Sequence, residues 1–238
     1  QPSALAGSLI AEPGMVAMSF GTSVVANAVG DRPFQGVSQA IDHFCAPDGR
    51  PINMVWIRNG TTAMNTMVEM LAGDHGSFDA VMPQVVAAAD DCGGLTALPF
   101  MDDEPGVGVS HGGTALVVGL NPDNANAGNA AKAMLAATMF NLRVGCDELD
   151  QQGFPRTEIV LSGGLVKTPA LGQLLADVFN TPVTIPDGAV EGTAYGAALM
   201  AKYRRARLDG QTLSWPEHLA AHASGRPQRF TPRPDAVA

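Results

Sequence analysis

The segment from Ile159 to Ala201 constrains the fold of this chain more than any other stretch. It opens on the apolar run Ile159–Leu161, which is typical of a buried strand, and the run breaks at Gly163 and Gly164. Apolar residues with helical spacing follow from Pro169. Because glycine has no side chain, a strand that ends in two glycines lets bare backbone approach a flat or phosphorylated ligand.

The second half of this segment predicts one more strand and one more helix. The helix after Pro169 should end at Asn180-Thr181-Pro182, since proline cannot continue a helix. Val183–Ile185 is expected to form a short strand, and a helix rich in small residues is expected from Glu191 to about Lys202. Alternating strands and helices favour an α/β architecture.

The end of this segment carries a motif that is similar to one in a known family. Glu191 to Ala201 follows the pattern E-x-G-x-x-x-G-A-A-x-x-A. Together with the preceding strand and glycine pair, it resembles the adenosine-binding segment of the FGGY carbohydrate kinases. The resemblance implies an actin-like ATPase (ribonuclease H-like) domain, with a mixed sheet and flanking helices. It is most similar to the xylulokinase branch, whose ending resembles Phe230–Pro234 here.

A second motif lies near the start of the chain, at Ser19–Ser23. Residues Gly14 to Val29 predict two short strands joined by a tight turn at Gly21-Thr22-Ser23. Backbone N–H groups and hydroxyls at such a turn can bind an anion, although a plain hairpin is an alternative interpretation. The sequence S-x-G-T-S resembles the second phosphate motif of the same kinases. Hairpin, helical insert and adenosine segment also come in the family's order.

The resemblance implies ATP and Mg²⁺ as cofactors and a short set of nucleotide-binding residues. Thr62 and Thr66 are weaker candidates from the helix expected after the Ile52–Ile57 strand. Lys167 has an alternative interpretation as an exposed lysine at a helix start. No metal ligand is predicted within the chain. The predicted nucleotide-binding residues are Gly21, Thr22, Gly163, Gly164, Lys167 and Thr168.

The catalytic aspartate that the resemblance implies is expected just before Gln1. In the family it belongs to a motif like G-D-[NQ]-x-x-A, and Gln1–Gly7 resembles the residues that follow it. The amino-terminal sugar-binding domain is likewise expected to be absent from this chain. Residues 1–202 are therefore predicted to be the carboxy-terminal, nucleotide-binding half of an ATP-dependent kinase for a sugar or polyol hydroxyl, inactive alone. Residues 203–238 are predicted to be an extended tail.

Two alternatives stay open at this point. The first is an actin-like nucleotide-binding module without sugar kinase activity, because the adenosine motif is shared across that superfamily. The second is a kinase-derived binding protein that has lost catalysis.

Asp102, Asp103 and Glu104 stand where the family often has G-E-R-x-P. They favour a solvated acidic loop over a set of Mg²⁺ ligands. His218 and His222 have no third ligand in their pattern, so a metal site is not predicted there.

Helices are also expected over Thr61–Leu71, Phe78–Asp90 and Ala127–Asn141, with a polar loop over Asp147–Gly153. The formal net charge of −9 argues against nucleic acid, since phosphate binding needs clustered cations, and Tyr203–Arg207 is interpreted as the solvated end of a helix. No apolar run approaches the ~18 residues that a membrane span needs.

The three cysteines, Cys45, Cys92 and Cys146, are odd in number and far apart. They are expected to be reduced and mostly buried thiols, which indicates a cytoplasmic location. The expected partners are the sugar or polyol substrate and the amino-terminal domain. A second copy of the chain, forming a homodimer, is an open alternative.

Overall fold

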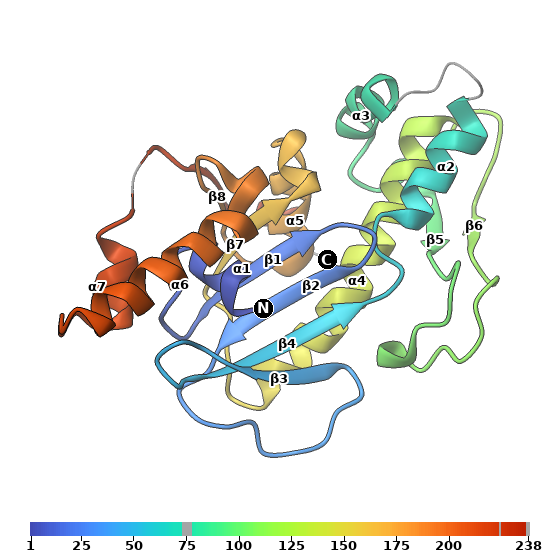
Figure 1. Ribbon diagram of the computed structural model, residues 1–238. Helices are drawn as coiled ribbons and strands as arrows, with labels where there is room; N and C mark the ends of the chain where they lie inside the picture. The colour runs from blue at the N-terminus through green and yellow to red at the C-terminus, as the bar shows by residue number, and fades with distance from the viewer. Residues whose placement is uncertain (73–77, 224, 237–238) are drawn as a thin grey trace.

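The computed structural model describes residues 1–72, 78–223 and 225–236. Within these residues a seven-stranded sheet has the order β3-β4-β2-β1-β7-β8-β9, and a two-stranded sheet pairs β5 with β6 (Figure 1). The strands are β1 (Met15–Phe20), β2 (Val24–Val29), β3 (Ile41–Cys45), β4 (Pro51–Ile57), β5 (Thr96–Leu98), β6 (Leu116–Val118), β7 (Glu158–Gly163), β8 (Val183–Ile185) and β9 (Gln228–Phe230).

Helices flank the large sheet, and the segment between β4 and β7 contains α2, α3 and α4 together with β5 and β6. The α-helices are α1 (Pro2–Gly7), α2 (Thr62–Ala72), α3 (Phe78–Ala87), α4 (Ala127–Gln151), α5 (Leu171–Phe179), α6 (Gly192–Leu208) and α7 (Trp215–Ala220). Short 3₁₀ turns lie at η2 (Cys92–Gly94), η3 (Pro105–Val107), η4 (Gly164–Lys167) and η5 (Ala189–Glu191).

The pairing of β1 with its two neighbours positions the ends of the strands that matter for function. β1 is antiparallel to β2, and the tight turn between them confirms the hairpin predicted at Gly14–Val29. β1 is parallel to β7, with Phe20 opposite Gly163 at the last paired position. The turn that begins at Gly21 therefore lies beside the glycines that end β7. The sheet is mixed and has flanking helices, as predicted.

The two faces of the sheet are covered differently. α4 and α5 cover one face, where Met134, Leu135, Met139 and Leu142 of α4 are fully buried in the main core. Burying each such side chain contributes about 1.5–3 kcal/mol to folding. α1 and α6 lie on the opposite face in Figure 1, where Leu5 of α1 packs on a smaller apolar cluster.

α1 and α6 approach each other closely because glycines meet at their contact. A Cβ atom on Gly196 would lie 1.8 Å from the carbonyl oxygen of Ser3, and one on Gly7 would lie 1.7 Å from that of Gly192. Real Cβ atoms do not occur at such distances, so the helix backbones touch where the side chains are missing. The glycines of the E-x-G-x-x-x-G motif thus lie at a helix contact.

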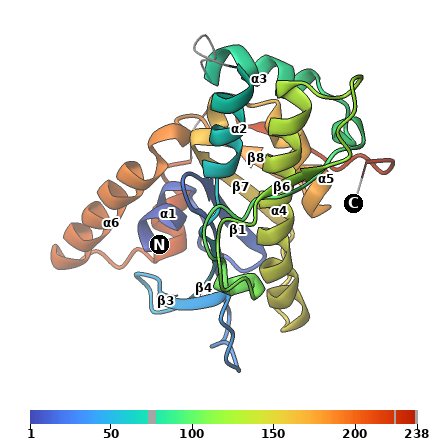
Figure 2. The same cartoon turned by 90° about the vertical axis from the view of Figure 1, so that its right-hand side faces the viewer.

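α2, α3 and the β5–β6 pair form a lobe beside the large sheet. α2 and α3 both pack on α4, and Figure 2 shows α2 and α4 side by side with β6 passing near them. The predicted helix over Phe78–Asp90 ends at Ala87, and Pro83 is accommodated inside it. This lobe supplies one wall of the pocket described below.

The carboxy-terminal half of α4 was not predicted, and part of the polar loop expected over Asp147–Gly153 is helical. α4 continues to Gln151 because its polar residues pair with one another and with the following loop. Arg156 contacts Asp147 at 2.5 Å and Asp150 at 3.0 Å. Gly145 lets the helix lie against Val55, since a Cβ there would be 2.4 Å from a Val55 methyl group.

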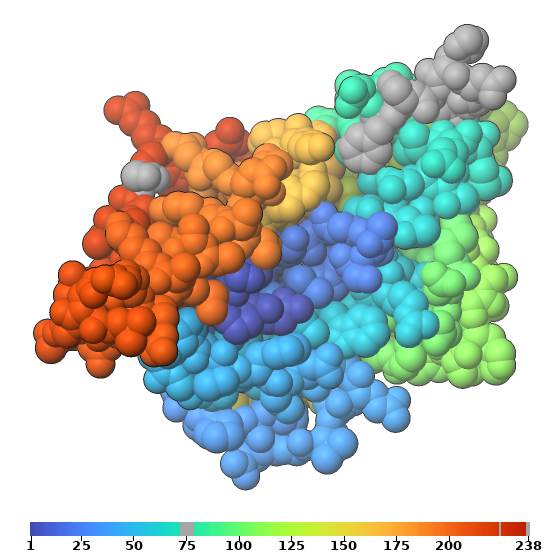
Figure 3. Space-filling view, viewed as in Figure 1, coloured from blue at the N-terminus to red at the C-terminus, as the bar shows by residue number. Residues whose placement is uncertain are grey.

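The extended tail predicted from residue 203 is wrong for much of that segment. α6 continues to Leu208, where its arginines form the solvated helix end that was expected. Ser214 and Glu217 form a capping box that starts α7, and Trp215 is buried. β9 then pairs with β8. In Figure 3 the atoms of α6 and α7, orange to red, form a lobe on the left of the molecule.

Candidate functional site

The turn between β1 and β2 presents backbone groups at the protein surface. The N–H of Gly21 donates to the carbonyl of Ser23 at 3.1 Å, which closes the turn. Among the described residues, the N–H groups of Thr22 and Ser23 have no protein acceptor. Two N–H groups from successive residues of a turn, with a threonine and a serine hydroxyl beside them, are suited to an anion such as a phosphate.

Gly163 is the last residue of β7 and Gly164 follows it, both next to this turn, and the two positions differ in whether a side chain would fit. Gly163 has φ +82°, and a Cβ there would lie 2.6 Å from Oγ of Ser19, so only glycine fits without strain. A Cβ on Gly164 would meet only the carbonyl oxygen of Phe20, at 3.4 Å. Gly164 therefore leaves bare backbone at a position where the fold itself tolerates a side chain.

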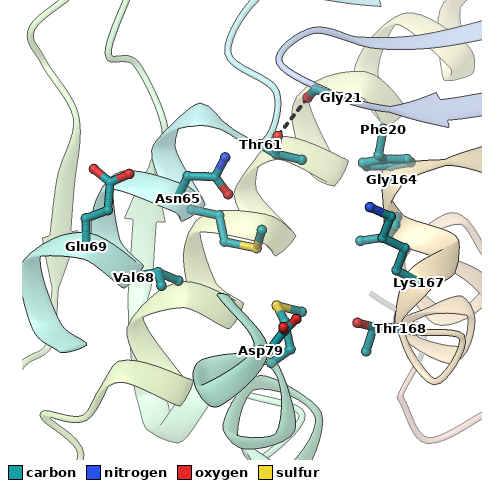
Figure 4. Close-up of a pocket in the computed structure, with 13 residues that line it drawn as sticks. Phe20, Gly21, Thr61, Asn65, Val68, Glu69, Asp79, Gly164, Lys167 and Thr168 are labelled. Carbon is teal, nitrogen blue, oxygen red and sulfur yellow. Dashed lines mark hydrogen bonds between the residues drawn. The ribbon is translucent and has the colours of Figure 1, made fainter. Parts of the chain in front are cut away.

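A pocket of about 550 Å³ lies between these glycines and the α2–α3 lobe. Figure 4 shows side chains of α2 and α3 on one side of the space, facing Phe20, Gly164, Lys167 and Thr168 on the other. Its volume is in the range of pockets that hold small molecules and cofactors. It is lined by Phe20, Gly21, Thr61, Met64, Asn65, Val68, Glu69, Asp79, Met82, Gly164, Leu165, Lys167 and Thr168.

The pocket has an apolar part and a polar end. Val68 and Met82 are buried side chains that can pack against the face of a flat ring. Asn65 also lines the pocket, and its buried Oδ1 atom has no hydrogen-bond partner among the described residues. Gly21 places the turn between β1 and β2 at the other end. An elongated ligand with a ring and an anionic group matches this division.

Charges of both signs line the pocket. Lys167, exposed at the end of η4, lies across the space from Glu69 and Asp79 on the two helices (Figure 4). A lysine is a compact charge that can approach a phosphate from a flexible stem. The carboxylates disfavour an anion on their own side, so a ligand's phosphates would lie toward Lys167 and the turn.

Four of the six predicted nucleotide-binding residues line this one pocket: Gly21, Gly164, Lys167 and Thr168. Thr22 and Gly163 adjoin it without being among its lining residues. Thr62 and Thr66 do not line it either, and the Thr66 hydroxyl donates to the carbonyl of Thr62 at 3.0 Å. The roles of all these residues stay predictions.

The residues of α2 and α3 that line the pocket were missed from the sequence, although α2 itself had been considered. Thr61, Asn65 and Val68 recur at helical spacing, which is the available signal, but the pattern does not reveal which face of α2 meets a ligand. The candidates Thr62 and Thr66 are each one position away from the lining residues Thr61 and Asn65. One position turns the side chain by about 100° around the helix.

The solvated acidic loop predicted at Asp102–Glu104 is wrong for Glu104. Glu104 is 1% exposed and accepts hydrogen bonds from backbone N–H groups of the bend between β4 and α2. Asp103 is partly exposed and pairs with Arg58. A carboxylate buried this way is held by the fold, so sequence composition alone gave the wrong environment.

The other chemical groups singled out in the sequence have structural partners. His218 is buried against the carbonyl of Leu199, and His222 contacts Nζ of Lys202. No group of three or more His, Cys, Asp or Glu residues suited to a metal ion occurs among residues 1–72, 78–223 and 225–236.

Burial raises the pKa of the Cys146 thiol to about 12, which makes it unreactive. None of the described helices is long and apolar enough to cross a membrane.

Comparison with known proteins places this architecture in a family. The profile of the FGGY family of carbohydrate kinases, C-terminal domain, matches residues 16–204. The xylulose kinase of Haemophilus influenzae is 29% identical over 190 residues, which cover 80% of this chain and 38% of that protein. The glycerol kinase of Gloeobacter violaceus is 29% identical over 207 residues, which cover 79% of this chain and 38% of that protein.

A solved structure is similar over most of the chain. The crystal structure of xylulose kinase from Bifidobacterium adolescentis superimposes with a TM-score of 0.71 at 26% sequence identity, covering 89% of this chain and 40% of that one. The chain thus spans about two fifths of the length of the kinases that it matches.

Proposed function

Because this chain belongs to the FGGY family of carbohydrate kinases, through the C-terminal domain of that family, we propose that it is the nucleotide-binding half of an ATP-dependent sugar or polyol kinase. One observation carries the proposal. The turn at Gly21 and the segment from Gly164 to Thr168, 143 residues apart at their nearest ends, line the same pocket. Both were predicted, from the resemblance to the same kinase family, to contact parts of ATP.

In the proposed binding mode the adenine ring lies in the apolar part of the pocket, near Val68, Met82 and Thr168. The phosphates lie toward the N–H groups of Thr22 and Ser23. Bare backbone at Gly164 allows the nucleoside to pass close to the chain. Lys167 adds a positive charge on the same side of the pocket.

In the proposed reaction a substrate hydroxyl oxygen attacks the γ-phosphorus of ATP, and the bond from that phosphorus to the β–γ bridging oxygen breaks as ADP leaves. A carboxylate accepts the hydroxyl proton. We propose that this carboxylate precedes Gln1 and that an amino-terminal domain supplies most contacts to the sugar. In this proposal the chain binds ATP, the phosphate donor. The rate enhancement comes from holding ATP and the substrate hydroxyl in position between the two domains.

Mg²⁺ belongs to this proposal as the partner of the ATP phosphates. Mg²⁺ usually keeps several waters and binds through one or two carboxylates together with phosphate. Because the described residues offer no cluster of three potential ligands, this chain is not expected to hold the ion without nucleotide. The three free cysteines, two of them buried, support the proposed cytoplasmic location.

The substrate is the least determined part of the proposal. Relatives named xylulose kinase and glycerol kinase match the chain equally well by identity, at 29% each. We favour a ketose over glycerol because the ending Phe230–Pro234 resembles that of the xylulokinase branch, and a solved xylulose kinase is 26% identical to the chain. A nucleotide-binding module without sugar kinase activity is the second candidate, since the pocket alone fits both.

Two measurements test the proposal. Calorimetric titration of the 238-residue chain should detect ADP and ATP binding in the presence of Mg²⁺, and absence of binding would contradict the nucleotide site. ATP turnover should then be measured with a protein in which this chain follows an amino-terminal FGGY domain, over a panel of ketoses and polyols. Nucleotide binding without sugar-stimulated turnover would favour the second candidate.

A further inference from the structure

Glu104 is a buried carboxylate that lies outside the pocket and has no part in the proposed reaction. Its Oε1 accepts a hydrogen bond from the backbone N–H of Arg58 at 2.9 Å, and its Oε2 accepts one from that of Asn59 at 2.8 Å. Hydrogen bonds to a charged acceptor are stronger than neutral ones and offset part of the cost of burying the charge. The carboxylate therefore fixes the backbone of the bend between β4 and α2.

Asn59 fastens the same bend through its side chain. Its Nδ2 donates to Oε2 of Glu104 and to the carbonyl of Asp102, both at 3.0 Å, and its Oδ1 accepts from the N–H of Asp102 at 2.8 Å. Asn59 is 2% exposed. Since every polar atom of this side chain is used, Asn59 and Glu104 hold the acidic loop and the bend in one arrangement.

The bend in turn holds the phosphate-binding turn. The N–H of Gly60 donates to the carbonyl of Thr22 at 3.0 Å. The N–H and the hydroxyl of Thr61 donate to the carbonyl of Gly21, at 2.9 Å and 3.0 Å. A Cβ on Gly60 would lie 2.5 Å from both carbonyl oxygens, so the two segments are in backbone contact. Glu104 thus reaches the turn through two successive residues, Asn59 and Gly60.

These bonds decide which way the turn's N–H groups point. In a trans peptide the C=O and the following N–H point in opposite directions. Gly60 and Thr61 hold the carbonyls of Thr22 and Gly21 on one side, so the N–H groups of Ser23 and Thr22 point to the other. Those are the groups that lack a protein acceptor among the described residues.

We propose that Glu104 is a positioning residue for the phosphate-binding turn: it orders the Arg58–Thr61 bend, and the bend orients the Thr22 and Ser23 N–H groups toward a phosphate. This inference rests on the proposed nucleotide site. It assigns Glu104 an effect on binding of the phosphates and none on binding of the base, which lies at the far end of the pocket.

The test compares ADP with adenosine in the variant Glu104→Gln of the 238-residue chain. Glutamine keeps the size but turns an NH₂ group toward one of the two backbone N–H donors, which loses that bond. ADP affinity should fall about tenfold, the effect of one buried donor left unpaired, while adenosine affinity should change less than about twofold. Asp102→Asn, which neutralises an exposed carboxylate of the same loop, should leave both affinities unchanged.

Each other outcome overturns the inference in its own way. Equal losses for ADP and adenosine would mean that Glu104 supports the whole fold without orienting the turn. Unchanged ADP affinity would mean that the turn does not depend on Glu104. If the unaltered chain binds neither ligand, the proposed function fails first, and the inference fails with it.

A second variant keeps the inference testable if Glu104→Gln does not fold. The Thr138 hydroxyl, from α4, contacts the carbonyls of Asn59 and Gly60 at 3.3 Å and 3.1 Å. Thr138→Val removes these bonds with little change in shape. ADP affinity should fall about threefold with adenosine affinity unchanged, because a single neutral hydrogen bond contributes about 1 kcal/mol or less here. No selective loss for ADP would count against the inference.

Discussion

Two glycine pairs in the segment Ile159–Ala201 have different structural roles. Gly163 and Gly164 end a strand beside the pocket, whereas Gly192 and Gly196 lie in α6, away from the pocket and against α1. The sequence motif treats them as one nucleotide-binding unit. The structure shows that the first pair exposes backbone to solvent and the second brings two backbones together. A glycine motif can therefore be assigned to a ligand only when the groups that contact its glycines in the structure are known.

The largest expected effect is on the helix contact. Gly196→Ala places a Cβ 1.8 Å from the carbonyl oxygen of Ser3, so α1 must move from α6. We expect the free energy of unfolding to fall by about 3 kcal/mol or more. Urea unfolding measures this loss. Gly192→Ala is the matched control, since its Cβ meets only the Ser162 side chain at 3.6 Å, and an equal loss there would contradict the assignment.

Next in size is the effect at Gly163. Alanine at this position must adopt φ +82° and displace Oγ of Ser19. A left-handed conformation for a residue other than glycine costs of order 1–3 kcal/mol, so the free energy of unfolding should fall by about 2 kcal/mol. Thermal or urea unfolding checks this value. A neutral outcome would show that the end of β7 relaxes easily.

Gly164 should separate binding from stability. Gly164→Val is tolerated by the backbone, because its Cβ meets only the Phe20 carbonyl at 3.4 Å, while its methyl groups enter the pocket. We expect at least about a tenfold loss of ADP affinity, and a change in unfolding free energy within about 1 kcal/mol. Unchanged ADP affinity, measured by calorimetry, would rule out the nucleotide site as placed here.

The smallest expected effect is a pH dependence of the unfolding free energy. It arises at His218 in α7, which packs on α6 away from the pocket. Burial lowers the pKa of His218, and nearby His222 and Lys202 add to this. Below the ordinary pKa of about 6.5 the unfolded chain takes up a proton that the folded chain does not, so stability falls as pH falls. In the unaltered chain the unfolding free energy should be lower at pH 5.5 than at pH 7.5. In His218→Gln this difference should be smaller, by less than about 1 kcal/mol.

ADP affinity should be unaffected by His218→Gln at either pH, since His218 does not line the pocket. A pH dependence of stability as large in the variant as in the unaltered chain would show that other groups carry it. A variant that loses ADP affinity would show that the two sides of the molecule are coupled.

The sequence allowed the backbone of the site to be predicted but not its whole surface. Turns depend on local residue types, so the turn at Gly21 and the strand end at Gly164 could be predicted from short motifs, and both glycines line the pocket. The α2 wall depends on how a helix is rotated against α4, which is decided by tertiary packing. That is why Asn65 and Val68 were missed and Thr62 and Thr66 were chosen.

The same limit explains the errors outside the site. The helix predicted over Ala127–Asn141 is too short, because the contact of Gly145 with Val55 and the ion pairs of Arg156 with Asp147 and Asp150 sustain α4 to Gln151. Glu104 looked like part of a solvated loop because its three hydrogen-bond donors lie 45 and 46 residues earlier in the chain. Local pattern carries no information about partners at that separation.

The pairing of β9 with β8 has a consequence for how this domain behaves in solution. β9 covers the outer edge of β8 and is the last strand of the seven-stranded sheet. An uncovered strand edge is a template for pairing with other molecules. The residues beyond β9 add an anchor, because Arg233 binds the buried carboxylate of Asp177 at 2.6 Å. Removing this segment would expose the edge of β8 and take away the partner of Asp177, so the truncated domain is expected to be less stable and more prone to self-association.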